Sequence, residues 1–164
     1  MTRIGLISDT HGFLDEKVFK HFEQVDEIWH AGDFGCIELA QTLSTFKPLR
    51  GVYGNIDGPE LRHRFPEALT FSCEALPVLM IHIGGYPGRY SKEAKALLSS
   101  QHPGLFISGH SHILKIMYDK AFQCLHINPG AAGRHGWHKT RTLVKFVVDQ
   151  REIRDCEVVE LGSR

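Results

Sequence analysis

The chain has 164 residues, 42% of them hydrophobic and 23% charged, which is the composition of an ordinary globular protein. This length suffices for one domain with a substantial core and is too short for two, so we predict a single domain over residues 1–164. The 19 basic and 19 acidic residues cancel, which argues against a broad surface for polymeric nucleic acid or an anionic membrane. Histidine, with 11 residues, is the compositional outlier.

The sequence predicts neither a membrane span nor a secreted protein. No run approaches the roughly 18 consecutive apolar residues of a spanning helix, and Met1 leads into an apolar strand without room for a signal peptide. The four cysteines lie far apart without Cys-x-x-Cys spacing: Cys36, Cys73, Cys124 and Cys156. We therefore expect free core cysteines in a protein of the reducing cytoplasm.

The first third of the chain alternates strands and helices. Apolar runs of strand length cover residues 3–8, 27–31 and 48–53. Apolar residues spaced three to four apart predict a helix after Asp15, which can cap it, and a second helix over 36–46. This order is typical of a parallel sheet with crossover helices.

The middle of the chain continues with two strands, over 68–73 and 77–83. The glycines of residues 84–89 predict a flexible loop. A helix capped by Ser91 and a strand over 104–108 follow.

The last third is different in kind. Strands over 115–118 and 122–127 flank a polar turn, and strands over 142–148 and 152–161 flank another. No helix is evident here. We therefore expect a second, mostly antiparallel sheet packed on the first.

Polar motifs stand where the apolar strand runs stop. Ligands of α/β sheets bind outside the carboxyl ends of the strands, so these motifs are expected to converge. Glycines before three of them, at positions 32, 54 and 109, allow tight turns that aim a side chain over the sheet. The five motifs are Asp9-x-His11, Gly32-Asp33, Gly54-Asn55, His82 and His110-x-His112.

Together these motifs supply two carboxylates, four imidazoles and one amide oxygen, without a thiolate. Such a set suits two divalent ions, with manganese preferred and iron, zinc, nickel or magnesium as alternatives. Seven ligands exceed the needs of one tetrahedral ion, whereas two ions sharing a carboxylate account for them and can clamp a phosphoryl displacement. Taken singly, His82 could be a hydrogen-bonded core histidine and Asp9 a turn cap.

The ordered series of these motifs resembles that of the calcineurin-like metallophosphoesterases. The short length and the turn Asn128-Pro129-Gly130 look like the YfcE-type bacterial and archaeal phosphodiesterase branch. The resemblance extends from Ile4 to about Gly130. It implies an α/β fold, namely an αββα sandwich of two mixed β-sheets flanked by helices.

The resemblance also implies a role for each motif residue. Asp33 would bridge two metal ions, and a hydroxide shared by the ions would attack phosphorus in line, since bound water ionises near a pH of about 7. Asp33, Asn55 and His110 would be catalytic. The first ion would be held by Asp9, His11 and His112, and the second by Asn55, His82 and His110.

One position departs from the family pattern. Many phosphatases of the family read Gly-Asn-His, where the histidine protonates the leaving oxygen, but here the third residue is Ile56. Because isoleucine donates no proton, we expect diesters and activated aryl esters to be favoured over alkyl monoesters. The resulting prediction is a phosphodiesterase acting on a small or nucleotide-like phosphodiester, with a phosphomonoesterase as an alternative.

Two loops could contact substrate. Arg89 follows His82 and could bind a phosphoryl oxygen, while Arg134 and His135 could line the cleft. Trp137 could stack on a base or an aryl group. Ordinary surface contacts are the alternative for each. His30, just before Gly32-Asp33, could support a metal ligand from behind.

A rival prediction comes from another class of protein. A retromer subunit of the same fold has lost metal ligands and works as a protein-interaction scaffold. All seven ligand positions are present here, which weighs against that alternative. The expected partner is a small phosphodiester rather than a polymeric nucleic acid, because no basic stripe is evident, and a homodimer through exposed strand edges stays open.

Overall fold

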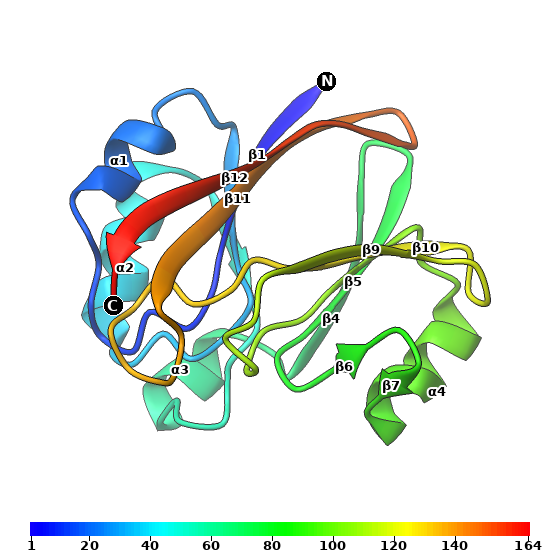
Figure 1. Cartoon of the computed structure of the whole chain (residues 1–164), viewed down its shortest axis with the longest axis horizontal. Helices are drawn as coiled ribbons and strands as arrows, with labels where there is room; N and C mark the ends of the chain where they lie inside the picture. The colour runs from blue at the N-terminus through cyan, green and yellow to red at the C-terminus, as the bar shows by residue number, and fades with distance from the viewer.

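Two five-stranded sheets face each other in the computed structural model, which describes residues 1–164 (Figure 1). The first sheet, in the order β12-β11-β1-β2-β3, contains β1 (Thr2–Ile7), β2 (Glu27–His30), β3 (Leu49–Gly51), β11 (Thr140–Asp149) and β12 (Glu152–Ser163). The second sheet, in the order β4-β5-β8-β10-β9, contains β4 (Ala68–Cys73), β5 (Leu76–Ile81), β8 (Leu105–Ile107), β9 (Lys115–Asp119) and β10 (Cys124–Asn128). Both sheets mix parallel and antiparallel pairs.

Helices cover the outer face of each sheet. The first sheet packs on α1 (Lys17–His21), α2 (Ile37–Phe46) and α3 (Pro59–Arg64), and the second on α4 (Lys92–Gln101). This αββα sandwich of two mixed sheets confirms the fold class predicted from the resemblance (Figure 1). None of the four helices is long and apolar enough to cross a membrane.

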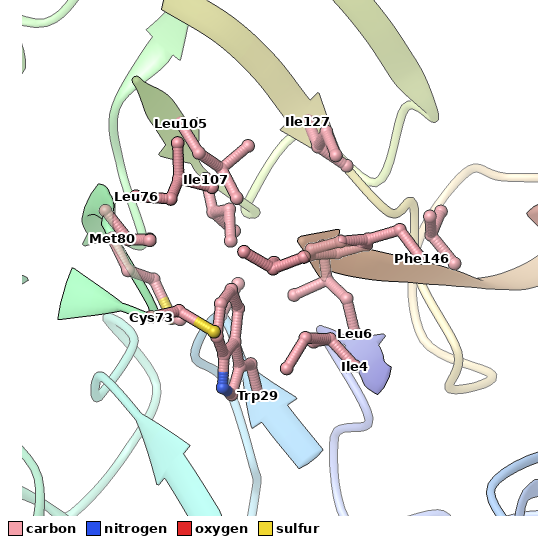
Figure 2. Close-up of a cluster of buried hydrophobic side chains, with 14 of the residues drawn as sticks. Ile4, Leu6, Trp29, Cys73, Leu76, Met80, Leu105, Ile107, Ile127 and Phe146 are labelled. Atoms are coloured by element: carbon pink, nitrogen blue, oxygen red, sulfur yellow. The ribbon is translucent and has the colours of Figure 1, made fainter. Parts of the chain in front are cut away.

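The main core lies between the two sheets. Side chains of both sheets point toward one another there, including Ile4 and Leu6 of β1 and Leu105 and Ile107 of β8 (Figure 2). Trp29 of β2 is fully buried at its centre. Its ring meets Phe71 of β4 edge-on, with 4.9 Å between centroids, and Phe146 of β11, with 5.7 Å. Such aromatic contacts tie the sheets together and fix the site that spans them.

The last third of the chain does not form a sheet of its own, so that prediction was wrong. β11 pairs antiparallel with β1, matching Phe146 to Ile4, and extends the first sheet. β10 pairs parallel with β8, matching His126 to Phe106, and extends the second. The hydrophobic alternation that predicts a strand says which face is buried but not which open edge the strand will join.

Residues 84–90 form a short hairpin rather than an irregular loop. β6 (Gly85–Tyr86) pairs with β7 (Arg89–Tyr90). Ser108 Oγ donates a hydrogen bond to the Gly85 carbonyl at 3.0 Å, and the Tyr90 hydroxyl donates one to Asp119 Oδ2 at 2.5 Å. The hairpin is therefore fastened to the second sheet at both strands.

Local sequence signals succeed at some helix ends and fail at others. The predicted cap of α4 is confirmed, because Ser91 Oγ accepts from the Ala94 amide at 3.1 Å. The helix α3 was not predicted, although Pro59 at its start is a common opening residue. All four cysteines are free as predicted, but Cys156 is exposed rather than in the core.

Candidate metal centre

Most of the predicted metal ligands have a left-handed backbone. This conformation is rare for residues with a side chain and clusters at functional sites. The five residues are Asp9, His11, Asp33, His110 and His112, with φ of 54°, 47°, 58°, 69° and 60°. His110 and His112 thus lie on a turn rather than on an extended strand, which frees their side chains from pointing to opposite faces.

The glycines beside the ligands serve two different purposes. Gly32 has a φ of 100°, as the predicted tight turn requires. Gly54 has no positive φ, and a Cβ there would collide with the Asp33 carboxylate. Its role is close approach of one loop to another rather than a special turn, which refines the prediction made from the sequence.

The first ligand group consists of Asp9, His11 and His112, whose candidate ligand atoms lie within 4.8 Å of one another. His112 Nε2 lies 3.1 Å from Asp9 Oδ1, and His11 Nε2 lies 3.8 Å from it. The other oxygen, Asp9 Oδ2, accepts from Ser8 Oγ at 2.6 Å and from the His110 amide at 3.1 Å. Asp9 therefore turns its uncommitted oxygen toward the two imidazoles.

The second group consists of Asp33, His82 and His110, again within 4.8 Å. Asn55 Oδ1 lies 3.1 Å from His82 Nε2 and 3.0 Å from His110 Nδ1, so it belongs to the same cluster. His82 Nδ1 donates to the Ala31 carbonyl at 2.7 Å. In the neutral ring this leaves the Nε2 lone pair facing the cluster, the orientation that a metal ligand needs.

Asp33 lies between the two groups. Its Oδ2 is 3.3 Å from His11 Nε2 in the first group and 3.2 Å from His82 Nε2 in the second. Its Oδ1 accepts from the Ile56 amide at 3.1 Å. One carboxylate oxygen thus faces both groups, at the place where the sequence predicts a bridging ligand.

The electrostatics of the centre favour positive charge. Burial raises the pKa of Asp9, but the neighbouring His11 and His112 lower it by more, so the net pKa lies below its usual range. The pKa of Asp33 is also lowered on balance, because the attraction of the His11 and His82 rings, whose Nε2 atoms lie 3.3 and 3.2 Å from Oδ2, outweighs its burial. The carboxylates of Asp33 and Asp9 in turn raise the pKa of His11 to about 9. Both carboxylates are therefore ionised at neutral pH and would attract a cation.

Two buried polar atoms of the centre lack hydrogen-bond partners, Asp9 Oδ1 and His11 Nε2. Leaving such atoms unpaired costs free energy, and a bound cation would satisfy both. The surrounding donors are carboxylate, imidazole and amide groups without a thiolate, as divalent first-row metals accept. The residues of this centre fit divalent metal ions.

A hydrogen-bonded chain supports the first group from behind. The Gly32 amide donates to His30 Nδ1 at 3.1 Å, so His30 Nε2 carries the proton and donates to Thr10 Oγ1 at 3.0 Å. Thr10 Oγ1 then donates to the Phe34 carbonyl at 2.9 Å. Burial lowers the pKa of His30 to about 3, which keeps the ring neutral. His30 thus joins the loops that carry Asp9 and Asp33 through Thr10 and the backbone, without touching the side chain of a candidate ligand.

Asp57 is a supporting residue that the sequence analysis missed. Its buried carboxylate fastens the loop after β2 to the loop after β3. It accepts hydrogen bonds from the amides of Phe34 at 3.2 Å, Gly35 at 3.0 Å and Gly54 at 2.8 Å. The sequence Asn-Ile-Asp-Gly signals a turn at this point, but not a carboxylate shared between loops.

The predicted substrate residues lie at different places. His135 stacks on His11, with 4.8 Å between ring centroids, and so borders the centre. Arg89 lines a pocket that also contains His110. Arg134 instead lies over the Phe13 ring at 4.3 Å, and Trp137 is 98% exposed. Of the four candidates, His135 therefore borders the centre and Arg89 lies in the adjoining pocket.

His138 also borders the centre and was not predicted. Its ring meets His112 edge-on at 5.3 Å, and its Nε2 lies 2.7 Å from the Gly133 carbonyl. No motif in the sequence marks this position.

Comparison with known proteins identifies the class of protein. Residues 2–151 match the model of the calcineurin-like phosphoesterase superfamily domain. The chain belongs to this superfamily of metal-dependent phosphoester hydrolases. It is 34% identical over 117 residues to a probable metallophosphoesterase of Methanothermobacter thermautotrophicus. The aligned residues make up 66% of each of the two chains. The chain spans about two thirds of the length of the curated relatives it matches.

Solved structures share the fold at lower identity. Vps29 of Entamoeba histolytica, solved with zinc, gives a TM-score of 0.73 at 16% identity and covers 96% of this chain and 98% of its own. The Escherichia coli phosphoesterase YfcE gives a TM-score of 0.61 at 17% identity and covers 94% of this chain and 98% of its own. The resemblance inferred from the motifs is confirmed at the level of family and fold.

Proposed function

We propose that this protein is a phosphodiesterase that uses two divalent metal ions to hydrolyse a small phosphodiester. The observation that supports this most directly is the position of Asp33. Its Oδ2 lies 3.3 and 3.2 Å from one imidazole of each ligand group, as a carboxylate shared between two ions would require.

Each ion has its own set of residues in this proposal. Asp33 is common to both. When bound, the ions supply Lewis acidity, which polarises phosphoryl oxygens and lowers the pKa of water toward about 7. Manganese is our first choice among the divalent ions that this donor set accepts. Asp9, His11 and His112 would hold the first ion, and Asn55, His82 and His110 the second.

The contribution of the protein is to hold the ligands in place before substrate arrives. The Ile56 amide fixes one oxygen of Asp33, and the Ala31 carbonyl fixes the ring of His82. The Ser8 hydroxyl and the His110 amide fix one oxygen of Asp9. Partners of this kind orient ligands so that little reorganisation accompanies the reaction.

The preference for diesters rests on Ile56. Its amide bonds to Asp33, and the residue is 46% exposed and follows Asn55 in the chain. A side chain at this place could reach a leaving oxygen, but isoleucine has no proton to give. General acid catalysis is typically worth ~10²–10⁴-fold, and its loss matters most for basic leaving groups such as those of alkyl monoesters.

Metal analysis followed by matched assays tests the proposal. The metal-free protein should be inactive and should regain activity with manganese. It should hydrolyse bis(p-nitrophenyl) phosphate with a higher kcat/KM than p-nitrophenyl phosphate. Asp33→Asn should lose both bound metal and activity, whereas the matched change Asp155→Asn, at an exposed position of β12 with the same left-handed backbone, should lose neither. An active Asp33→Asn variant without metal would contradict the proposal.

A scaffold function is the alternative, and an exposed apolar stretch around β9 favours it. Ile113, Met117 and Tyr118 are 62%, 45% and 57% exposed. A pure scaffold, however, would have no need of two complete ligand groups held by buried partners. The same assays separate the two functions, because a scaffold would show no metal-dependent hydrolysis that Asp33→Asn could remove.

A further inference from the structure

A pocket of about 350 Å³ adjoins the metal centre. It shares His110 with the second ligand group, and its walls are hairpin β6–β7, the start of β9 and residues of β10. Pockets that bind small molecules measure roughly 300–1,000 Å³, so this one can hold a substituent of a small substrate. A phosphate bound at the centre would place one of its ester groups at the mouth of this pocket.

Contacts between its walls hold the pocket in shape. The Tyr90 hydroxyl ties the hairpin to Asp119 at the end of β9, and Ser108 ties it to β8. Lys115 Nζ lies 3.9 Å from the centre of the Tyr86 ring, a cation–π contact across the pocket wall. These contacts reduce the ordering that a ligand would otherwise have to impose.

The charge of the pocket is positive. Lys115 and Arg89 both line it, and no carboxylate does. Neither cation has a carboxylate partner within 4.0 Å. Asp119, which shares β9 with Lys115, already accepts hydrogen bonds from the Tyr90 hydroxyl and the Ala121 amide. Two uncompensated cations in a concave site attract an anion.

The pocket also contains an acceptor without a donor. His126 lines it, is 1% exposed, and has no hydrogen-bond partner at Nε2. Its Nδ1 lies 3.2 Å from the Phe106 carbonyl, which can only accept, so Nδ1 carries the proton and Nε2 a lone pair. Burial lowers the pKa of His126 to about 4, so the ring is neutral near pH 7. A hydroxyl on the ligand would supply the missing donor.

We propose that this pocket binds one ester group of the phosphodiester, and that this group is hydroxylated and carries a second anionic charge. Lys115 and Arg89 bind the second anion, and His126 accepts from the hydroxyl. A dinucleotide with a terminal phosphate has this chemistry. The proposal rests on the proposed function, because it names the substrate class of the same centre.

Three matched dinucleotides test the substrate class on the manganese-loaded protein. ApA has no terminal phosphate, pApA carries one at its 5′ end, and ApAp carries one at its 3′ end. Adenosine and adenylate release is measured by chromatography. We expect kcat/KM for pApA or ApAp, whichever end faces the pocket, to exceed that for ApA by roughly tenfold, the value of one charge-assisted contact.

Variants of Lys115 and Arg89 test which residues bind the second anion. Lys115→Met and Arg89→Met should each lower the preference for the phosphorylated dinucleotide, and the double variant should bring the ratio near one. Lys120→Met, at the exposed turn between β9 and β10, is the matched control and should keep the wild-type ratio.

The hydroxyl contact has its own test. His126→Phe should lower kcat/KM for ApA relative to bis(p-nitrophenyl) phosphate, which has no hydroxyl, and a thermal melt confirms that the variant is folded. An unchanged ratio in a folded variant would overturn the role of His126.

The charge assignment would be overturned if neither phosphorylated dinucleotide were preferred, or if the preference survived in the double variant. Hydrolysis of bis(p-nitrophenyl) phosphate by the same wild-type sample separates the two kinds of failure. If that diester is cleaved and no preference appears, the pocket assignment alone is wrong. If no diester is cleaved with metal present, the proposed function itself fails.

Discussion

The two ligand groups of the centre are built from the same chemistry but differ in their surroundings. In the first group Asp9 is fully buried and its Oδ1 lacks a hydrogen-bond partner, as does His11 Nε2. In the second group His82 is buried, but Asn55 and His110 are exposed, and His110 also lines the pocket beside the centre. In the proposed function the first group would therefore depend more on a bound ion, while the second would be the one open to substrate.

The largest effect should come from removing the buried carboxylate of the first group, Asp9. Loss of a residue that only supports a metal ligand lowers metal affinity by about 10–100-fold, so we expect Asp9→Asn, which removes a ligand, to lower it by more than about 100-fold. Asn55→Ala, at an exposed position of the second group, should lower metal affinity by less and should mainly lower kcat. Elemental analysis and steady-state kinetics on both variants measure the difference. Equal metal loss in both would contradict the contrast between the groups.

Metal removal should lower stability through the first group. A ligand present at 100 times its dissociation constant stabilises the native state by about 2.7 kcal/mol. We expect manganese at that concentration to raise the free energy of unfolding of the wild type by this amount, as measured by urea denaturation with and without chelator. The stabilisation should be much smaller in Asp9→Asn. A wild-type stability that does not respond to manganese would argue against a built site.

The exposed side of the second group, around Asn55, should control selectivity. Ile56→His places a proton donor beside Asn55, and we expect the ratio of glycerol 2-phosphate to bis(p-nitrophenyl) phosphate hydrolysis to rise about tenfold, a modest share of what general acids provide. Val158→His, at a partly exposed position on β12, is the control and should leave the ratio as it is. A ratio that stays the same in Ile56→His would refute the account of diester preference.

The smallest effect should come from breaking the series of hydrogen bonds through His30 and Thr10 behind the first group. Thr10→Val keeps the shape of the side chain but leaves His30 Nε2 without an acceptor and the Phe34 carbonyl without this donor. A buried group left unsatisfied costs about 1–3 kcal/mol. Urea denaturation should show a loss in this range. Thr42→Val, which removes an exposed hydroxyl in α2, should show a smaller one.

The sequence predicted the convergence of the motif residues better than it predicted the make-up of the sheets. Each motif lies just beyond a strand, and the structure brings the motifs together because the parallel strands of each sheet end on the same side and the two sheets face each other. The membership of β9 to β12 in the two sheets was not predictable in this way. Which edge a strand joins depends on pairings such as that of Phe146 with Ile4, far apart in the sequence.

Residues outside the motifs could not be placed by sequence patterns. Lys115 and His126 read as members of an ordinary hairpin, and only the pairing of β10 with β8 brings them beside His110. Asp57 reads as part of a turn, although its carboxylate joins two loops. Their roles depend on contacts between segments that the chain separates by many residues.

The left-handed backbone at Asp9 and Asp33 also bears on how such a protein changes over generations. Among residues with a side chain, asparagine and aspartate tolerate this conformation best, so asparagine can replace either aspartate without disturbing the turn. The codons of the two amino acids differ by a single base. A single-base change to asparagine at either position would therefore remove the carboxylate while preserving the fold and its surface. An inactive descendant of such an enzyme would begin as an intact binding protein.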